Sequence, residues 1–126
     1  MKHAKLTKTV FWLLMLQFVL GMLANLYGTI PHDKPYDVFR QVGFISAHAL
    51  NGSLLLILGI VLAVKSRHTD AFRPAAAGVF HVALAFTFGE LFVFTQQDIF
   101  SLLMALAFVG ALVIYAKLVF ADSDSK

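Results

Sequence analysis

Four long runs of apolar residues restrict what this sequence can fold into. They cover residues 9–28, 44–64, 74–94 and 99–119. Each run is close to the roughly 20 apolar residues that an α-helix needs to cross the hydrocarbon core of a bilayer. The sequence therefore predicts an all-α integral membrane protein, an antiparallel bundle of four transmembrane helices forming a single domain over residues 1–126. The first run follows a basic leader but lacks a small-residue cleavage site, so we expect it to be retained as a span.

Composition excludes several other classes of protein. Of the 126 residues, 60% are hydrophobic and 13% are charged, whereas soluble domains average about 45–50% and about 25%. There are no cysteines, which excludes disulfides and thiolate metal sites. No basic stripe points to a nucleic-acid partner, and no hydrolase motif of the Gly-x-Ser-x-Gly or His-Glu-x-x-His type is present.

The segments between the runs predict how the spans are connected. Residues 29–43 form a polar loop in which Pro31 and Pro35 prevent a continuous helix. The second half of this loop is expected to lie along the membrane surface. Residues 95–98 are so short a connection that spans three and four must form an antiparallel hairpin, with Asp98 as a candidate N-cap of the fourth helix.

The distribution of Lys and Arg predicts the orientation of the bundle. One side carries most of these residues: Lys2, Lys5, Lys8, Lys65, Arg67, Arg73, Lys117 and Lys126. The other side carries Lys34 and Arg40. By the positive-inside rule both termini are expected in the cytoplasm, as in a multi-pass protein of the cell membrane. Trp12, Tyr27 and Tyr115 lie near span ends, where amphipathic rings favour the membrane interface.

Polar residues inside the spans are the candidates for function, because such groups are costly in a bilayer. His48 and Asn51 lie near the start of the second span. From a rise of 1.5 Å per residue, His48 and Glu90 each lie about 9 Å outward of their span centres, and Asn25 about 10 Å outward. Ser101 lies near the outer start of the fourth span. All four helices can thus present a polar group at one level in the outer leaflet.

The same residues share helix faces with small side chains, which mark close helix contacts in membranes. On the second helix, His48 shares a face with Gly52 and Gly59, and Asn51 lies beside this face. On the first helix Gln17, Gly21 and Asn25 share a face, and on the third helix Ala83, Thr87 and Glu90 do so. His81 points to nearly the opposite side of the third helix from Glu90. It is expected to face a neighbouring subunit, a second site or a different seam of the bundle.

Three interpretations of these polar residues remain open. The first is a binding site for a haem, with His48 as its metal ligand, or for a quinone whose carbonyl would meet His48, Asn51 or Glu90. The second is proton or ion coupling by a protonation-sensitive pair of His48 and Glu90, which would require a dimer of so small a bundle. The third is structural: His48 hydrogen-bonds a neighbour such as Glu90 or Asn25, and the chain is an accessory subunit of a larger membrane complex.

Four short features of the spans can be compared with known families: Leu16-Gln17-x-x-Leu20-Gly21, Ile30-Pro31, His48 at the outer start of the second span, and Phe88-Gly89. Together they resemble one four-helix half of haem A synthase. The resemblance implies a haem b site with His48 as a ligand. The second ligand histidine of that family has no counterpart in residues 98–105, so haem A synthesis is not implied. The chain is also similar to small bacterial four-span membrane proteins with Asn-Leu-Tyr ending span one and Ser-Leu-Leu-Met-Ala opening span four, which implies a bacterial inner membrane.

Overall fold

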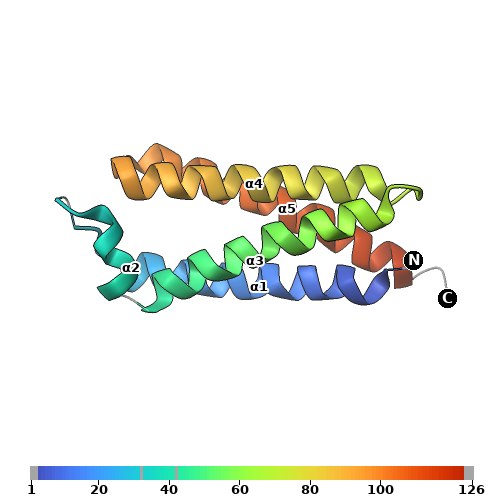
Figure 1. Ribbon diagram of the computed structural model, residues 1–126, viewed down its shortest axis with the longest axis horizontal. Coiled ribbons are helices and arrows are strands. Elements are labelled where there is room, and N and C mark those ends of the chain that lie inside the picture. The colour runs from blue at the N-terminus through green and yellow to red at the C-terminus, as the bar shows by residue number, and fades with distance from the viewer. Residues whose placement is uncertain (1–2, 32, 42, 124–126) are drawn as a thin grey trace.

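Helices make up nearly all of the computed structural model, which describes residues 3–31, 33–41 and 43–123 (Figure 1). The four long helices are α1 (Ala4–Tyr27), α3 (Gly43–Ser66), α4 (Phe72–Thr95) and α5 (Asp98–Ser123). The loop after α1 contains a 3-10 turn, η1 (Pro35–Asp37), and the single helical turn α2 (Val38–Gln41). No strand occurs in these described ranges, which confirms the predicted all-α class.

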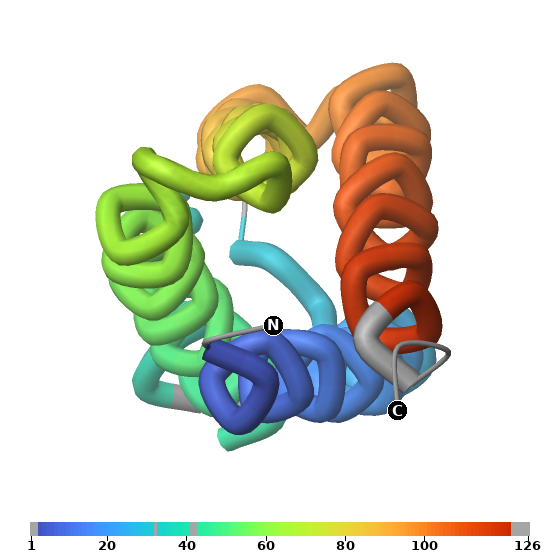
Figure 2. The backbone as a smooth tube through the Cα atoms, turned by 90° about the vertical axis from the view of Figure 1, so that its right-hand side faces the viewer, coloured from blue at the N-terminus to red at the C-terminus, as the bar shows by residue number. Residues whose placement is uncertain are grey.

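The long helices form a ring in which each one packs against two neighbours. α1 contacts α3 and α5, and α4 contacts the same two helices. Within the described residues the backbones of neither diagonal pair, α1 with α4 or α3 with α5, approach each other closely. Figure 2, an end-on view, shows this square arrangement. Successive helices run antiparallel, so α1 begins and α5 ends at the same end of the bundle, called here the terminal end (Figure 1).

The opposite end, called here the loop end, is where α1 ends and α3 begins. Pro35 occupies the first turn of η1, where its missing N–H leaves no hydrogen bond unmade. α4 ends at the loop end with Gln96 in the left-handed conformation (φ 55°). α5 then begins at Asp98 itself, rather than with Asp98 as the preceding cap. Its carboxylate lies in the first turn, where the helix dipole favours negative charge.

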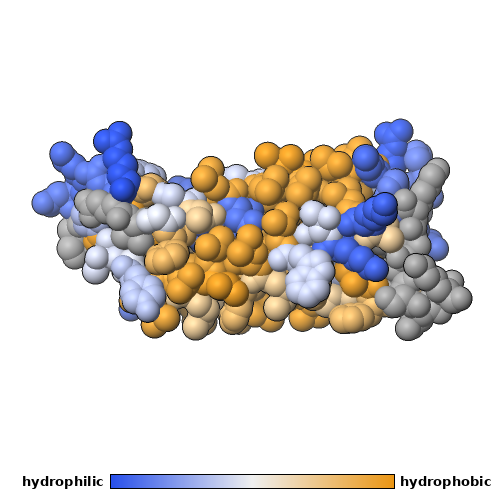
Figure 3. All heavy atoms as spheres, turned by 90° about the horizontal axis from the view of Figure 1, so that it is seen from below, coloured by the Kyte–Doolittle hydropathy of each residue, from blue (hydrophilic) through white to orange (hydrophobic). Residues whose placement is uncertain are grey.

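The exterior of the bundle is apolar between two polar ends. All four long helices are long and apolar enough to cross a membrane. Figure 3 shows hydrophobic residues covering the middle of one face, with hydrophilic residues gathered at both ends. Large side chains such as Leu50 and Phe94 are more than half exposed, as expected for surfaces that face lipid.

The position of Tyr115 differs from the one expected from the sequence. Tyr115 was expected at the membrane interface with Trp12 and Tyr27, and these two residues are both 67% exposed. Tyr115 is instead fully buried. Its ring fills the space left by two glycines: a Cβ on Gly78 would lie 2.7 Å from Cζ of Tyr115, and one on Gly59 would lie 3.0 Å from its hydroxyl oxygen. Tyr115 thus joins α5 to α3 and α4 in the core of the bundle.

Candidate functional site

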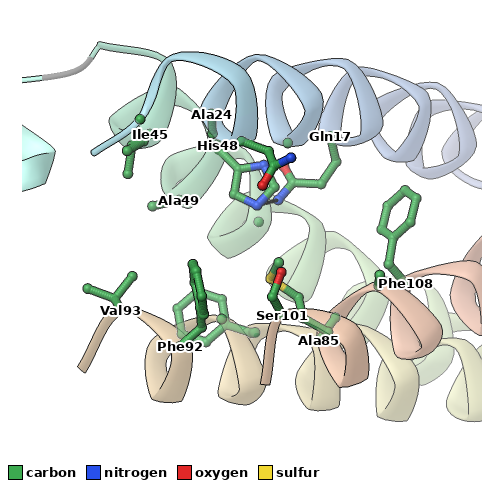
Figure 4. A pocket seen from close by; sticks show the side chains of 18 of the residues that line it. Gln17, Ala24, Ile45, His48, Ala49, Ala85, Phe92, Val93, Ser101 and Phe108 are labelled. Carbon is green, nitrogen blue, oxygen red and sulfur yellow. Dashed lines mark hydrogen bonds between the residues drawn. The ribbon is translucent and has the colours of Figure 1, made fainter. Parts of the chain in front are cut away.

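A cavity of about 610 Å³ lies in the loop-end half of the bundle. All four long helices contribute to its walls, and five of the polar residues selected from the sequence line it: Gln17, Asn25, His48, Glu90 and Ser101. Figure 4 shows Gln17 and His48 on one side of the cavity and Ser101 on the other. The volume falls within the range of about 300–1,000 Å³ that is typical of small-molecule sites.

Most of the remaining lining is apolar and aromatic. Four phenylalanines from α1, α4 and α5 contribute to it: Phe18, Phe86, Phe92 and Phe108. The loop after α1 covers the loop end of the cavity with Ile30, Val38 and Phe39, and Val38 is fully buried. An apolar lining with a few convergent polar groups is what a binding site for a largely apolar molecule requires.

A chain of hydrogen bonds runs from the backbone of α1 to His48. The side-chain nitrogen Nδ2 of Asn51 donates to the carbonyl oxygen of Leu13 at 3.0 Å and to Oε1 of Gln17 at 2.7 Å. Nε2 of Gln17 then lies 3.2 Å from Nε2 of His48. Asn51 and Gln17 are both buried. The chain therefore joins α1 to α3 in the interior.

The carbonyl of Leu13 fixes the direction of every bond in this chain. A backbone carbonyl can only accept, so the Asn51 atom beside it must be the amide nitrogen. The Gln17 atom next to that nitrogen must be the oxygen, which leaves the Gln17 nitrogen to face His48. An amide nitrogen only donates, so Nε2 of His48 must be the accepting, unprotonated nitrogen. A neutral imidazole then carries its proton on Nδ1.

The protonated nitrogen of His48 has no acceptor in the part of the chain that the structure describes. Nδ1 is buried and lacks a hydrogen-bond partner among the described residues. The residue beside it on α1 is Gly21, which also lines the cavity. A Cβ on Gly21 would lie 3.1 Å from Cε1 and 3.4 Å from Nδ1 of His48. The glycine therefore lets α1 pack closely against the imidazole, and a side chain at this position would crowd Nδ1.

Glu90 and His48 share the cavity but are not bonded to each other. The pairing of His48 with Glu90 or Asn25, one of the alternatives considered from the sequence, is not what the structure shows, because the imidazole bonds Gln17 instead. Glu90 is partly exposed, and within the described ranges no hydrogen bond or ion pair to it is found. Its carboxyl group, like the hydroxyl of Ser101, is a polar feature of the cavity wall.

Two selected residues lie outside the cavity lining. Asn51 lies behind the wall, where it orients Gln17. His81 lies at the seam between α4 and α5, so of the three expected locations the structure has it at a different seam of the bundle. Its Nδ1 donates to the carbonyl of Ala77 at 2.9 Å. A Cβ on Gly110 would lie 2.3 Å from Cδ2 of His81, so the imidazole packs directly on α5.

The link between Gln17 and His48 was not predicted from the sequence. Gln17 was expected on the polar face of the first helix, with no partner assigned to it. A signal was present: His48 and Asn51 are three residues apart on one helix, so both can meet a single long amide side chain on a neighbouring helix.

Within the described part of the chain, no group of three or more His, Asp or Glu residues could hold a metal ion.

No known protein family, curated protein or solved structure matches this chain. The chemistry of the cavity is therefore inferred from its own residues.

Proposed function

We propose that the chain is a multi-pass membrane protein that binds a quinone-type ligand, a flat ring bearing carbonyl oxygens, in the loop-end cavity. The observation that carries the proposal is the buried Nδ1–H of His48, which has no acceptor in the described structure. A carbonyl oxygen is the kind of group that this donor can bind. With both termini in the cytoplasm, the cavity would lie in the outer half of the cell membrane.

The energetics favour a ligand that accepts a hydrogen bond. A buried donor without a partner costs about 1–3 kcal/mol. A ligand carbonyl that reaches Nδ1 would remove this cost, so the same free energy would contribute to binding. The phenylalanines around the cavity would pack on the ring, and Glu90 and Ser101 supply polar groups for its other side. The hydrogen bonds from Asn51 and Gln17 hold the imidazole ready before the ligand arrives.

The same hydrogen bonds argue against haem b as the occupant. An imidazole binds iron through an unprotonated nitrogen. The lone pair of Nε2 is already shared with the amide of Gln17, and Nδ1 carries the proton. Ligation of iron by His48 would therefore require the bond between Gln17 and His48 to break. A quinone requires no such change, so we favour it over the haem that the resemblance to haem A synthase implies.

The test is a titration of purified protein in lipid nanodiscs with a quinone that has no tail. The wild type is expected to bind. His48→Ala should weaken binding about tenfold, equivalent to about 1.4 kcal/mol, because the donor is lost. His81→Ala is the matched control and should bind as the wild type does, since His81 lies at the seam between α4 and α5. Failure of the wild type to bind would contradict the proposal.

A second arm of this experiment decides between quinone and haem. The same preparation is supplemented with haem and its absorption spectrum is recorded. We expect no Soret band that depends on position 48. A Soret band in the wild type that disappears in His48→Ala would overturn the quinone proposal in favour of haem ligation.

A further inference from the structure

We infer that the ligand carries a long apolar tail, and that this tail leaves the cavity sideways into the membrane between α1 and α5. This inference rests on the proposed function and adds to it the class of ligand and its route. It depends on how the cavity wall differs from one seam of the ring to the next.

Exposed residues of the cavity lining occur only on one side of the bundle. They belong to α1 with the residues that follow it and to α5: Phe18, Met22, Asn25, Thr29, Asp98, Ala105 and Val109. An opening of the cavity at one seam would produce exposed lining residues on both helices of that seam. We therefore infer that the cavity opens between α1 and α5.

The other walls are covered. The described residues of α3 and α4 that line the cavity are all buried or partly buried. The loop end is covered by the segment that carries η1 and α2, which is attached at both sides. The hydroxyl of Ser46 donates to the carbonyl of Phe39, and Nε2 of Gln96 donates to the carbonyl of Pro31 at 3.5 Å. This segment limits access from the water beyond the loop end, where Thr29 and Asp98 are the exposed residues of the described lining.

The course of the two helices explains the opening. α1 and α5 lie close together at the terminal end and diverge toward the loop end (Figures 1 and 2). Aromatic pairs connect them at two levels: Phe11 with Phe120, with ring centroids 6.5 Å apart, and Phe18 with Phe108, stacked at 6.4 Å. Beyond the second pair the helices separate. α1 and α5 also pack more loosely than any other neighbouring pair.

The chemistry of the seam identifies what can pass through it. Met22, Ala105 and Val109 give the opening apolar edges on the surface that faces hydrocarbon. A charged or polar chain would lose its hydration there without gaining partners. An isoprenoid or alkyl tail would pass from the cavity into lipid without such a loss. A long-tailed quinone, with its ring at His48 and its tail between α1 and α5, matches both the polar wall and the apolar exit.

The experiment compares two ligands and two variants in lipid nanodiscs. The ligands are one quinone head group with and without an isoprenoid tail. Ala105→Trp places a large ring at the edge of the opening. Leu106→Trp is its matched control, since Leu106 is exposed on the same helix but does not line the cavity. Retained helical circular dichroism and a monodisperse elution profile establish that both variants fold.

Ala105→Trp should lower the affinity for the tailed quinone about tenfold and change that for the tail-less one by less than about twofold. Leu106→Trp should change neither. If Ala105→Trp leaves the affinity for the tailed quinone unchanged, or weakens both ligands equally, the lateral exit is wrong while quinone binding stands. If the wild type binds neither ligand, the proposed function itself fails and the exit with it.

Discussion

The side-chain nitrogen Nε2 of Gln17 lies 3.2 Å from Nε2 of His48, and it joins α1 to α3 at the wall of the cavity. The direction of this bond follows from the carbonyl of Leu13 through Asn51. Because Gln17 can only donate here, the proton of His48 is left on Nδ1, where no acceptor is found in the described structure. The hydrogen bonds that join α1 to α3 and the proposed binding site therefore share one residue, His48.

Asn51→Leu should destabilise the bundle, although Asn51 does not line the cavity. The substitution removes two hydrogen bonds and leaves Oε1 of Gln17 buried without a donor. We expect a loss of about 1–3 kcal/mol in the free energy of unfolding. Equilibrium unfolding of the purified protein in mixed micelles with increasing SDS measures it. Ser53→Ala is the control, since among the described residues the Ser53 side chain bonds only the carbonyl of Ala49 in its own helix. Equal stability of both variants would contradict the role of Asn51.

Gly21→Ala should impair binding more than it impairs folding. The new methyl group would lie 3.1 Å from Cε1 and 3.4 Å from Nδ1 of His48, against the ring nitrogen that we propose binds the ligand oxygen. We expect about a tenfold loss of quinone affinity and about 1 kcal/mol of destabilisation from crowding. Gly43→Ala provides the control, because apart from the adjoining backbone nothing in the described structure lies within 4 Å of a Cβ at that position. Unchanged affinity in Gly21→Ala would place the ligand elsewhere.

Tyr115→Phe should leave the bundle as stable as the wild type or stabilise it by about 1 kcal/mol. The ring is needed to fill the space beside Gly59 and Gly78, but its buried hydroxyl has no partner among the described residues. Tyr27→Phe, at an exposed position, should have little effect. A clear loss of stability in the Tyr115→Phe protein, measured by SDS unfolding, would show that the hydroxyl has a partner of its own.

The fold could be predicted from the sequence because a bilayer requires long apolar helices, and these are visible as runs of residues. The structure extends the second, third and fourth predicted spans at both ends, for example to Gly43–Ser66 for the second, since polar residues beyond the apolar run continue the helix. The first helix begins earlier than predicted, at Ala4, and ends at Tyr27. Depth estimates also placed Asn25, His48, Glu90 and Ser101 at one level, and the helix face grouped Gln17 with Asn25. All five residues line the cavity.

Partners across helices could not be predicted in the same way. Periodicity shows which residues share a face, but the rotation of one helix against another decides which of them touch. His48 therefore bonds Gln17 rather than Glu90, and Asn51 lies behind the wall. Tyr115 was assigned to the interface from its position near a span end, whereas the space beside Gly59 and Gly78 on two other helices decides where its ring lies.

The most direct test of the account is the protonation state of the His48 ring. Nitrogen-15 NMR of the ligand-free protein, with imidazole nitrogens labelled and the His48 signals assigned through a His48→Ala variant, distinguishes the two neutral tautomers. The account predicts a proton on Nδ1, coupled to that nitrogen, and an unprotonated Nε2 that accepts from Gln17. A proton on Nε2 would contradict the direction of the hydrogen-bond chain, and with it the donor on which the proposed ligand depends.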